Sequence, residues 1–143
     1  MARVIIYVDG SARGNPGPAG IGVVICDSNN KIINQIKRAL SPTTNNIAEY
    51  EALICGLESA LIHDADQVVV RSDSELVVRQ SLGHYKVRAQ HLKPLAEQVQ
   101  RLIRGFDRVI FERIPREKNK QADRLARLAS SIKKAPDESG DRS

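Results

Sequence analysis

The spacing of apolar positions changes along the chain, and each change marks a predicted element. β-branched residues dominate 3–9, and the run stops at an Asp-Gly pair before a loop rich in glycine and proline. A second apolar run fills 20–26. After a polar turn, apolar residues recur at spacing four over 31–40. We therefore predict three antiparallel strands at the start of the chain.

A helical spacing follows these strands. Polar residues that can cap a helix precede apolar positions that recur at helical spacing over 46–62. A neighbouring stripe holds the small residues Ala52, Gly56 and Ala60. Because Gly56 would cost about 1 kcal/mol relative to alanine in an exposed helix, we predict that this stripe packs closely against the sheet.

The second half of the chain alternates between strand and helix patterns. We predict a strand at 67–73, a short helix at 74–82, a helix from Leu92 to Ile103 that Gly105 ends, a strand at 107–114 and a helix capped by Asn119. The helix before 67–73 implies a crossover, so this strand should pair in parallel with an earlier one. Residues 1–134 are predicted to form one domain, and the polar segment 135–143 a disordered tail.

Composition adds little but is consistent with this picture. The 143 residues suit one domain, and 22 Lys and Arg against 17 Asp and Glu give a formal charge of +5, which is compatible with a polyanionic partner. Cys26 and Cys55 fall in apolar segments, as expected of reduced structural thiols. The N-terminal apolar run is too short for a signal-peptide core or a membrane span, so we expect a cytoplasmic protein without membrane contact.

Acidic residues occupy the ends of four predicted elements. Asp9 ends a strand, Glu49 lies in the first turn of a helix, Asp73 ends another strand, and Asp123 opens the last helix. Hard divalent cations prefer carboxylate oxygen, and their catalytic sites keep positions open for water and substrate phosphate. The four acids together predict a divalent metal site.

Each acid taken singly also has a structural interpretation. Asp9 is compatible with a turn, Asp73 with capping the short helix, and Glu49 with a capping box that includes Asn46. Asp123 is favourably placed for a helix dipole. Their joint placement is what favours a metal site.

Four motifs in order along the chain carry a resemblance to a known family. YVDGSARGNPGPAGIG opens the chain, TNNIAEYEAL begins the first helix, RSDSELVV lies in the middle, and NKQADRLA is near the end. Over residues 3 to about 131 the chain resembles ribonuclease H type 1. The resemblance implies an α/β fold with a mixed five-stranded sheet flanked by helices, in which the first and fourth strands are parallel neighbours at the centre.

The resemblance also implies a reaction. Members of this family bind two Mg²⁺ or Mn²⁺ ions and cleave the RNA strand of an RNA/DNA hybrid, leaving 5′-phosphate and 3′-hydroxyl ends. By analogy, Asp9 bridges both ions, Glu49 and Asp73 hold the first, and Asp123 holds the second. One ion activates the attacking water and the other stabilises the leaving oxygen.

Substrate contacts are likewise implied by position. The family reads the 2′-hydroxyls of RNA through residues that match Gly10, Ser11, Ala12 and Glu49 here. Further contacts are expected from Asn15, Asn46 and Gln80 in the minor groove, from Thr44 to a DNA-strand phosphate, and from Lys86 and Arg88 to phosphates. Capping by Asn46 and turn formation by Asn15 are equally compatible with the sequence.

Two departures from the family pattern stand out. Many members carry a histidine in the loop before the last helix, whereas this chain has none after His91. We hypothesise that Arg116 partly substitutes for it by stabilising phosphate charge, with a solvated charged loop as the alternative. Only 83–91 separates the two middle helices and tryptophan is absent, so the chain has the short form without a basic protrusion.

Other functions of the same fold stay open at this level. A catalytically weak or inactive nucleic-acid-binding module is one, and another nuclease of the superfamily is a second. Proofreading exonucleases usually show Asp-x-Glu, whereas this chain has Asp9-Gly10-Ser11. We expect a monomer that acts on RNA/DNA hybrid and needs no obligate protein partner.

Overall fold

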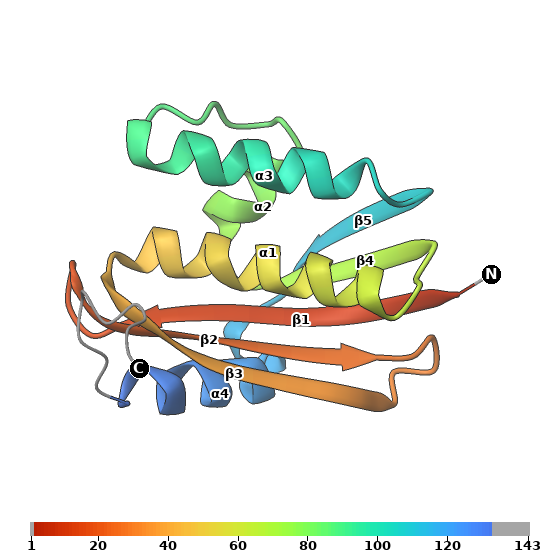
Figure 1. Ribbon diagram of the computed structural model, residues 1–143, viewed down its shortest axis with the longest axis horizontal. Helices are drawn as coiled ribbons and strands as arrows, with labels where there is room; N and C mark the ends of the chain where they lie inside the picture. The colour runs from red at the N-terminus through yellow and green to blue at the C-terminus, as the bar shows by residue number, and fades with distance from the viewer. Residues whose placement is uncertain (1, 133–143) are drawn as a thin grey trace.

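The computed structural model describes residues 2–132, which form a five-stranded sheet with helices on both faces (Figure 1). The strands are β1 (Arg3–Ala12), β2 (Gly17–Cys26), β3 (Ile32–Thr43), β4 (Gln67–Ser72) and β5 (Arg108–Arg113). The helices are α1 (Asn45–Ile62), α2 (Glu75–Ser81), α3 (Lys93–Ile103) and α4 (Lys120–Ser130), with short 3₁₀ helices η1 (Gln90–Leu92) and η2 (Arg116–Lys118). Every predicted helix and strand is present in the predicted order.

The strand order is β3-β2-β1-β4-β5, with β1 at the centre. β1 is antiparallel to β2 and parallel to β4, and Val8 of β1 pairs with Ser72 of β4. β5 is also parallel to β4. The mixed α/β sheet and the central parallel pair are therefore confirmed.

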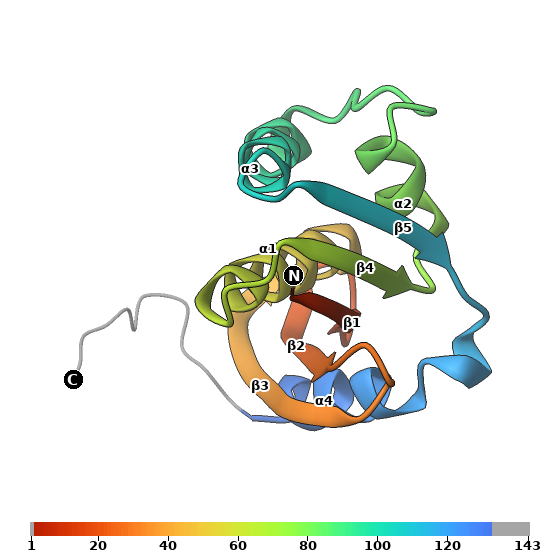
Figure 2. The ribbon, with the colours of Figure 1, turned by 90° about the vertical axis from the view of Figure 1, so that its right-hand side faces the viewer.

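The helices cover opposite faces of this sheet (Figure 2). The larger core lies between the sheet and α1 with α3, and the smaller lies beneath the sheet against α4. Close packing of the small stripe on α1 is confirmed, because a Cβ atom at Gly56 would stand 2.8 Å from Ile6 Cδ1 and 2.9 Å from Val8 Cγ1. The face of β1 that carries Ile6 and Val8 is thereby sealed by α1.

The first three strands are longer than the sequence predicts. β1 continues to Ala12, because Ser11 pairs with Gly20 and Ala12 with Ala19 across the hairpin. β2 begins at Gly17 and β3 runs to Thr43, and these two residues pair with each other. Backbone pairing thus carries the strands through glycine-rich and polar sequence that has low strand propensity.

Two further expectations concern the C-terminal tail and membrane contact. The tail predicted at 135–143 lies outside the described residues. Within 2–132, the protein contains no helix whose length and apolarity would allow it to cross a membrane.

Candidate active site

Asp9 is a buried carboxylate in the interior of β1, with 4 % of its surface exposed. The prediction that it ends a strand is wrong, since β1 continues for three residues beyond it through its pairing with β2. The predicted turn at Asp9-Gly10 is excluded for the same reason. Its position is set by strand pairing, one residue after the Val8–Ser72 pair that joins β1 to β4.

Glu49 reaches the site from α1. The expected first-turn position and the capping box with Asn46 are wrong, because α1 begins at Asn45 and Thr44 caps it by accepting a hydrogen bond from Ile47 N–H at 3.3 Å. Glu49 therefore lies in the second turn and is buried. Its Oε1 accepts a hydrogen bond from Gly10 N–H at 2.9 Å.

Gly10 permits this approach of α1 to β1. A Cβ atom at Gly10 would overlap the backbone of Ala48 and Glu49. No other residue type leaves room there without moving the helix away from the strand. The Asp-Gly sequence thus places the second carboxylate within reach of the first.

Asp73 and Asp123 complete the group. Asp73 directly follows β4, as predicted, and it does not cap α2, whose N-cap is Ser74. Asp123 lies in the first turn of α4, as predicted. Its proximity contributes to the raised pKa of Asp9, and its Oδ2 accepts a hydrogen bond from Arg127 Nε at 3.0 Å.

Three of the four acids gather as predicted. Carboxylate oxygens of Asp9, Glu49 and Asp73 lie within 4.8 Å of one another, and Asp123 is near enough for its charge to act on Asp9. The four residues come from β1, α1, the end of β4 and α4. They meet where the carboxyl ends of the parallel strands β1 and β4 lie side by side.

Burial and mutual repulsion perturb two of these groups strongly. Burial, followed by the charges of Glu49, Asp73 and Asp123, raises the pKa of Asp9 to about 9. Burial is also the largest cause that raises the pKa of Glu49 to about 8, while the Gly10 hydrogen bond and the Arg116 charge act in the opposite direction. Without a cation, Asp9 and Glu49 hold their protons to unusually high pH.

The donor set fits a hard divalent cation. Three carboxylates converge on one point, and the burial of Asp9 and Glu49 disfavours several negative charges at once. A dication would remove this repulsion and favour the ionised carboxylates. The site therefore suits a hard divalent cation.

The residues expected to contact substrate differ in how far they are exposed. Gly10 is buried, Ser11, Ala12 and Thr44 are half-buried, and Asn15, Asn46, Lys86 and Arg88 are exposed. The Gln80 side chain makes two hydrogen bonds within the protein. Its Oε1 accepts a hydrogen bond from Tyr50 Oη at 2.6 Å, and its Nε2 donates to Lys86 O at 3.3 Å. One lone pair of Oε1 and one N–H of Nε2 are left for its predicted minor-groove contact.

Arg116 lies in η2, on the exposed surface next to the acids. Its charge acts on Glu49 strongly enough to oppose the rise in the pKa of that carboxyl group. The exposure of Arg116 is equally compatible with the alternative of a solvated charged loop. Arg116 is the positive charge that the η2 turn brings to the acid group.

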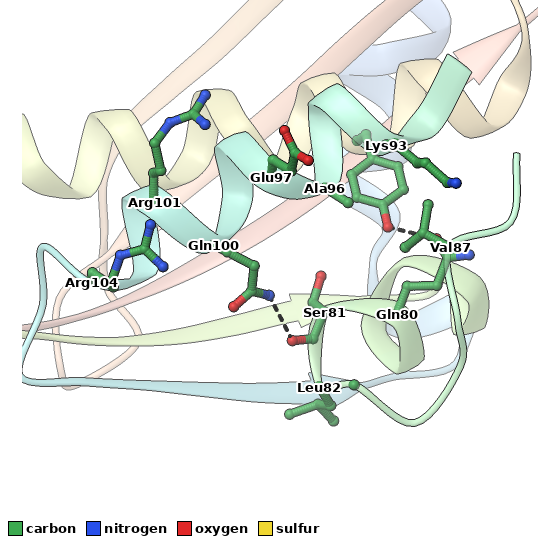
Figure 3. Close-up of a pocket in the computed structure, with 12 residues that line it drawn as sticks. Gln80, Ser81, Leu82, Val87, Lys93, Ala96, Glu97, Gln100, Arg101 and Arg104 are labelled. Carbon is green, nitrogen blue, oxygen red and sulfur yellow. Dashed lines mark hydrogen bonds between the residues drawn. The ribbon is translucent and has the colours of Figure 1, made fainter. Parts of the chain in front are cut away.

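A pocket of about 720 Å³ lies away from the acids, between α2 and α3 (Figure 3). Its wall includes Tyr50, the Gln80 side chain and Lys93. Gln100 Nε2 closes part of it by donating to Ser81 O at 3.1 Å. The bond from Gln80 Nε2 to Lys86 O holds the segment that carries Lys86 beside α2.

Sequence reasoning missed two residues beside the acids. The sequence predicts Asn119 only as the cap of α4, but its side chain makes no cap bond and instead donates from Nδ2 to Val8 O at 3.0 Å. The apolar stripe of α4 places Arg127 on the solvent face, yet Arg127 bonds Asp123. Only the spacing of four between Asp123 and Arg127 on a helix could have indicated that second contact.

Comparison with known proteins places this fold and site in one class. The family described as reverse transcriptase-like matches residues 7–129. The N-terminal RNase H domain of a Mycobacterium tuberculosis protein superposes with a TM-score of 0.89 at 42% identity, over 92% of this chain and 95% of that one. RNase H1 from Halobacterium salinarum gives a TM-score of 0.88 at 37% identity, over 90% of this chain and 98% of that one.

A third structure shows a relative with nucleic acid. LC11-RNase H1, isolated from compost, was solved in complex with RNA/DNA hybrid, and it superposes with a TM-score of 0.84 at 46% identity, over 90% of this chain and 96% of that one. The chain belongs to the ribonuclease H type 1 family. It spans 34% of the length of the full mycobacterial protein, named Bifunctional protein Rv2228c, with 43% identity over 125 residues that make up 87% of this chain.

Proposed function

We propose that this protein is an endonuclease that hydrolyses the RNA strand of RNA/DNA hybrids with two Mg²⁺ or Mn²⁺ ions and leaves 5′-phosphate and 3′-hydroxyl ends. The observation that carries the proposal is the convergence of carboxylate oxygens of Asp9, Glu49 and Asp73 within 4.8 Å, with the charge of Asp123 acting on Asp9. The hybrid bound to the LC11 relative supports the choice of substrate.

The four carboxylates have distinct tasks in this proposal. The charges of Glu49, Asp73 and Asp123 all act on Asp9, so Asp9 is the residue that would be shared between two ions. Glu49 and Asp73 would complete one position, and Asp123 the other. Bound divalent ions supply Lewis-acid activation of water and stabilisation of the leaving oxygen.

Recognition of RNA would use the backbone beside Asp9. Ser11 and Ala12 are half-buried in β1, next to the acids, where backbone groups can approach a ribose 2′-hydroxyl. Gly10 N–H is already bonded to Glu49, so Glu49 is held in place for the same contact. Asn15, Asn46 and Thr44 would extend the surface along the hybrid, with Lys86 and Arg88 as phosphate contacts.

Arg116 would act beside Glu49. Its guanidinium stays charged at all relevant pH values, so it cannot act as an acid or base as a histidine does. It can stabilise phosphate charge, and it lowers the pKa of Glu49, which favours the ionised form of that carboxyl group. Arg116 is therefore proposed as a partial substitute for the histidine that other members carry in this loop.

The molecule as a whole is proposed to act as a monomer, with its catalytic domain at 1–134. The free cysteines Cys26 and Cys55 are both buried, which suits a reducing compartment such as the cytoplasm. We therefore propose the cytoplasm as the place where the protein acts.

The test is a substrate panel. Purified protein is incubated with labelled RNA/DNA hybrid, RNA duplex, DNA duplex and each single strand, in magnesium, manganese or chelator. We expect internal cleavage of the RNA strand of the hybrid, dependent on either ion, with 5′-phosphate ends. Binding of hybrid without cleavage would indicate an inactive module, and cleavage of DNA would indicate another nuclease of the superfamily.

A further inference from the structure

Asn119 connects two parts of the acid site that are far apart in sequence. Its side chain is only 1 % exposed, and its Nδ2 donates to Val8 O at 3.0 Å across 111 positions of sequence. Val8 immediately precedes Asp9. The bond therefore fixes the start of α4 to the strand at the residue next to the central carboxylate.

The backbone of Asn119 extends this connection in both chain directions. Its carbonyl accepts the Asp123 N–H at 3.0 Å, and its own N–H donates to Arg116 O at 2.9 Å. One residue thus joins β1 beside Asp9, the first turn of α4 beside Asp123, and the η2 turn that holds Arg116. A displacement of Asn119 would move these groups relative to one another.

The arrangement carries an energetic penalty that a purely stabilising residue would not need. Asn119 Oδ1 is buried and has no hydrogen-bond partner among the described residues. An unpaired buried acceptor destabilises the fold, because it loses its hydrogen bond to water. Asparagine is also a favoured N-cap residue, yet this side chain leaves its own helix uncapped and bonds to β1 instead.

Other contacts already hold α4 against the sheet. A Cβ atom at Gly22 would overlap the carbonyl of Ala122, so the helix lies directly on β2. At the far end, Arg13 Nε donates to Ser130 Oγ at 3.0 Å. These contacts hold α4 on β2 and on the loop after β1, whereas the Asn119 side chain ties the start of α4 to β1 at the residue before Asp9.

The geometry points to Asn119 as a positioning residue, which sets the separation between the Asp9 and Asp123 carboxylates that the proposed function assigns to metal binding. It touches neither substrate nor metal and acts through the backbone of Val8 and Asp123. This inference rests on the proposed function, since it concerns the same site.

Asn119→Ser tests it with the fold preserved. Serine is a good N-cap residue, so α4 keeps a cap, but its shorter side chain cannot reach Val8 O. We measure kcat and KM on labelled hybrid, and separately the Mn²⁺ concentration that gives half of the maximal thermal stabilisation without substrate. The expected changes are a loss of about 10-fold in kcat, an unchanged KM, and a rise of about 10-fold in the Mn²⁺ midpoint.

Asn119→Ala and Val99→Ala complete the set. Asn119→Ala removes the same bond without adding a cap, so it should lower kcat and raise the Mn²⁺ midpoint in the same way. Val99 is fully buried in α3 and far from the acids, so Val99→Ala lowers stability while kcat and the midpoint stay at the wild-type values.

The outcomes separate this inference from the proposed function. If wild type cleaves hybrid and Asn119→Ser keeps both its kcat and its Mn²⁺ midpoint, Asn119 is only structural and the inference is overturned. A drop in kcat with an unchanged midpoint also overturns it, because metal spacing would then not be what the residue sets. If wild type neither cleaves nor responds to Mn²⁺, the proposed function itself fails.

Discussion

Two neighbouring parts of β1 are both buried but opposite in chemistry. Val4 to Val8 contribute apolar side chains to the cores on both faces of the sheet, while Asp9, the next residue, buries a carboxylate among three others. The first part lowers the free energy of the fold, since burial of each large apolar side chain contributes roughly 1.5–3 kcal/mol. The second part raises it, since like charges share a site poor in water.

The apolar part of the fold holds the acidic residues in place. The strand pairing and the α1 packing that bury Ile6 and Val8 are the same interactions that bring Asp9, Glu49 and Asp73 together. A stable core can hold a cluster that would repel itself apart on a flexible scaffold. The site should therefore be stabilised by a cation, and the core should be indifferent to it.

Asp9→Asn is expected to give the largest effect. Loss of the shared carboxylate removes several kcal/mol of metal-dependent stabilisation, so kcat on hybrid should fall by about 10³-fold or more. The metal-free variant should melt higher than wild type at pH 8, because one of the acids that repel one another is gone. Steady-state cleavage and thermal melting in chelator check the two parts, and cleavage at near wild-type rate would contradict the assignment.

Ile6→Ala is the matched change in the apolar part. Ile6 is fully buried under α1, so truncation should lower the free energy of unfolding by about 2–5 kcal/mol. The folded fraction should keep the wild-type kcat and the wild-type response to Mg²⁺. Denaturant unfolding monitored by circular dichroism gives the first quantity. A large loss of kcat in fully folded Ile6→Ala would contradict the assignment of Ile6 to stability alone.

The stability of the metal-free protein should depend on pH through the same contrast. Asp9 and Glu49 have pKa values of about 9 and about 8 in the fold, against ordinary values of 3.8 and 4.5, so the folded state binds more protons than the unfolded chain between these limits. Their contribution to the free energy of unfolding is complete below about pH 4 and is lost as the pH rises toward 9. Melting temperatures in chelator should therefore fall from pH 5 to pH 8 more steeply for wild type than for Asp9→Asn.

Magnesium should counteract that decline. A bound dication favours the ionised carboxylates, so the rise in melting temperature on adding Mg²⁺ should be larger at pH 8 than at pH 5. Equal pH slopes for wild type and Asp9→Asn would mean that the acids do not repel one another in the folded protein.

Much of this contrast could be predicted from sequence, and the reasons are local. Apolar periodicity located each element, and the four acids were found because each lies near an element end. Strand limits were wrong at Ala12, Gly17 and Thr43, because hairpin pairing extends strands through residues with low propensity. Glu49 fell one turn later than expected because Thr44, and not Asn46, caps α1.

The direction of single polar side chains could not be predicted. Asn119 has the right sequence position for a cap, and only the fold reveals that its amide reaches Val8 instead. Gln80 likewise matches a substrate position but is bonded to Tyr50 and Lys86. In both cases a partner distant in sequence competes with the local role, and spacing along the chain carries no signal for it.

Arg116→Ala should produce a smaller effect than loss of an acid. Removal of the guanidinium leaves Glu49 without its nearest opposing charge, so turnover should fall by about 10-fold, with product release slowed as well. Lys118→Ala in the same 3₁₀ turn is the control and should be near wild type. Single-turnover and steady-state rates measured together check this, and unchanged values for both would remove Arg116 from the reaction.

Loss of exposed cations should have the smallest effect. The double variant Lys86→Ala with Arg88→Ala should bind hybrid more weakly, with a salt slope reduced by up to about 0.9 for each phosphate that is no longer neutralised. Lys31→Ala with Arg108→Ala removes two exposed cations away from the acids and should leave the slope unchanged. Affinities over a salt series decide the matter, and identical slopes for the two double variants would exclude Lys86 and Arg88 as phosphate-binding residues.

The most direct test of the central claim is anomalous diffraction from a crystal of the wild-type protein soaked in Mn²⁺, with a bound hybrid whose RNA strand cannot be cleaved. The expected result is manganese between residue 9, Glu49 and Asp73, with a second ion near Asp123. Manganese bound only elsewhere, or the four side chains turned away from one another in the crystal, would contradict the account.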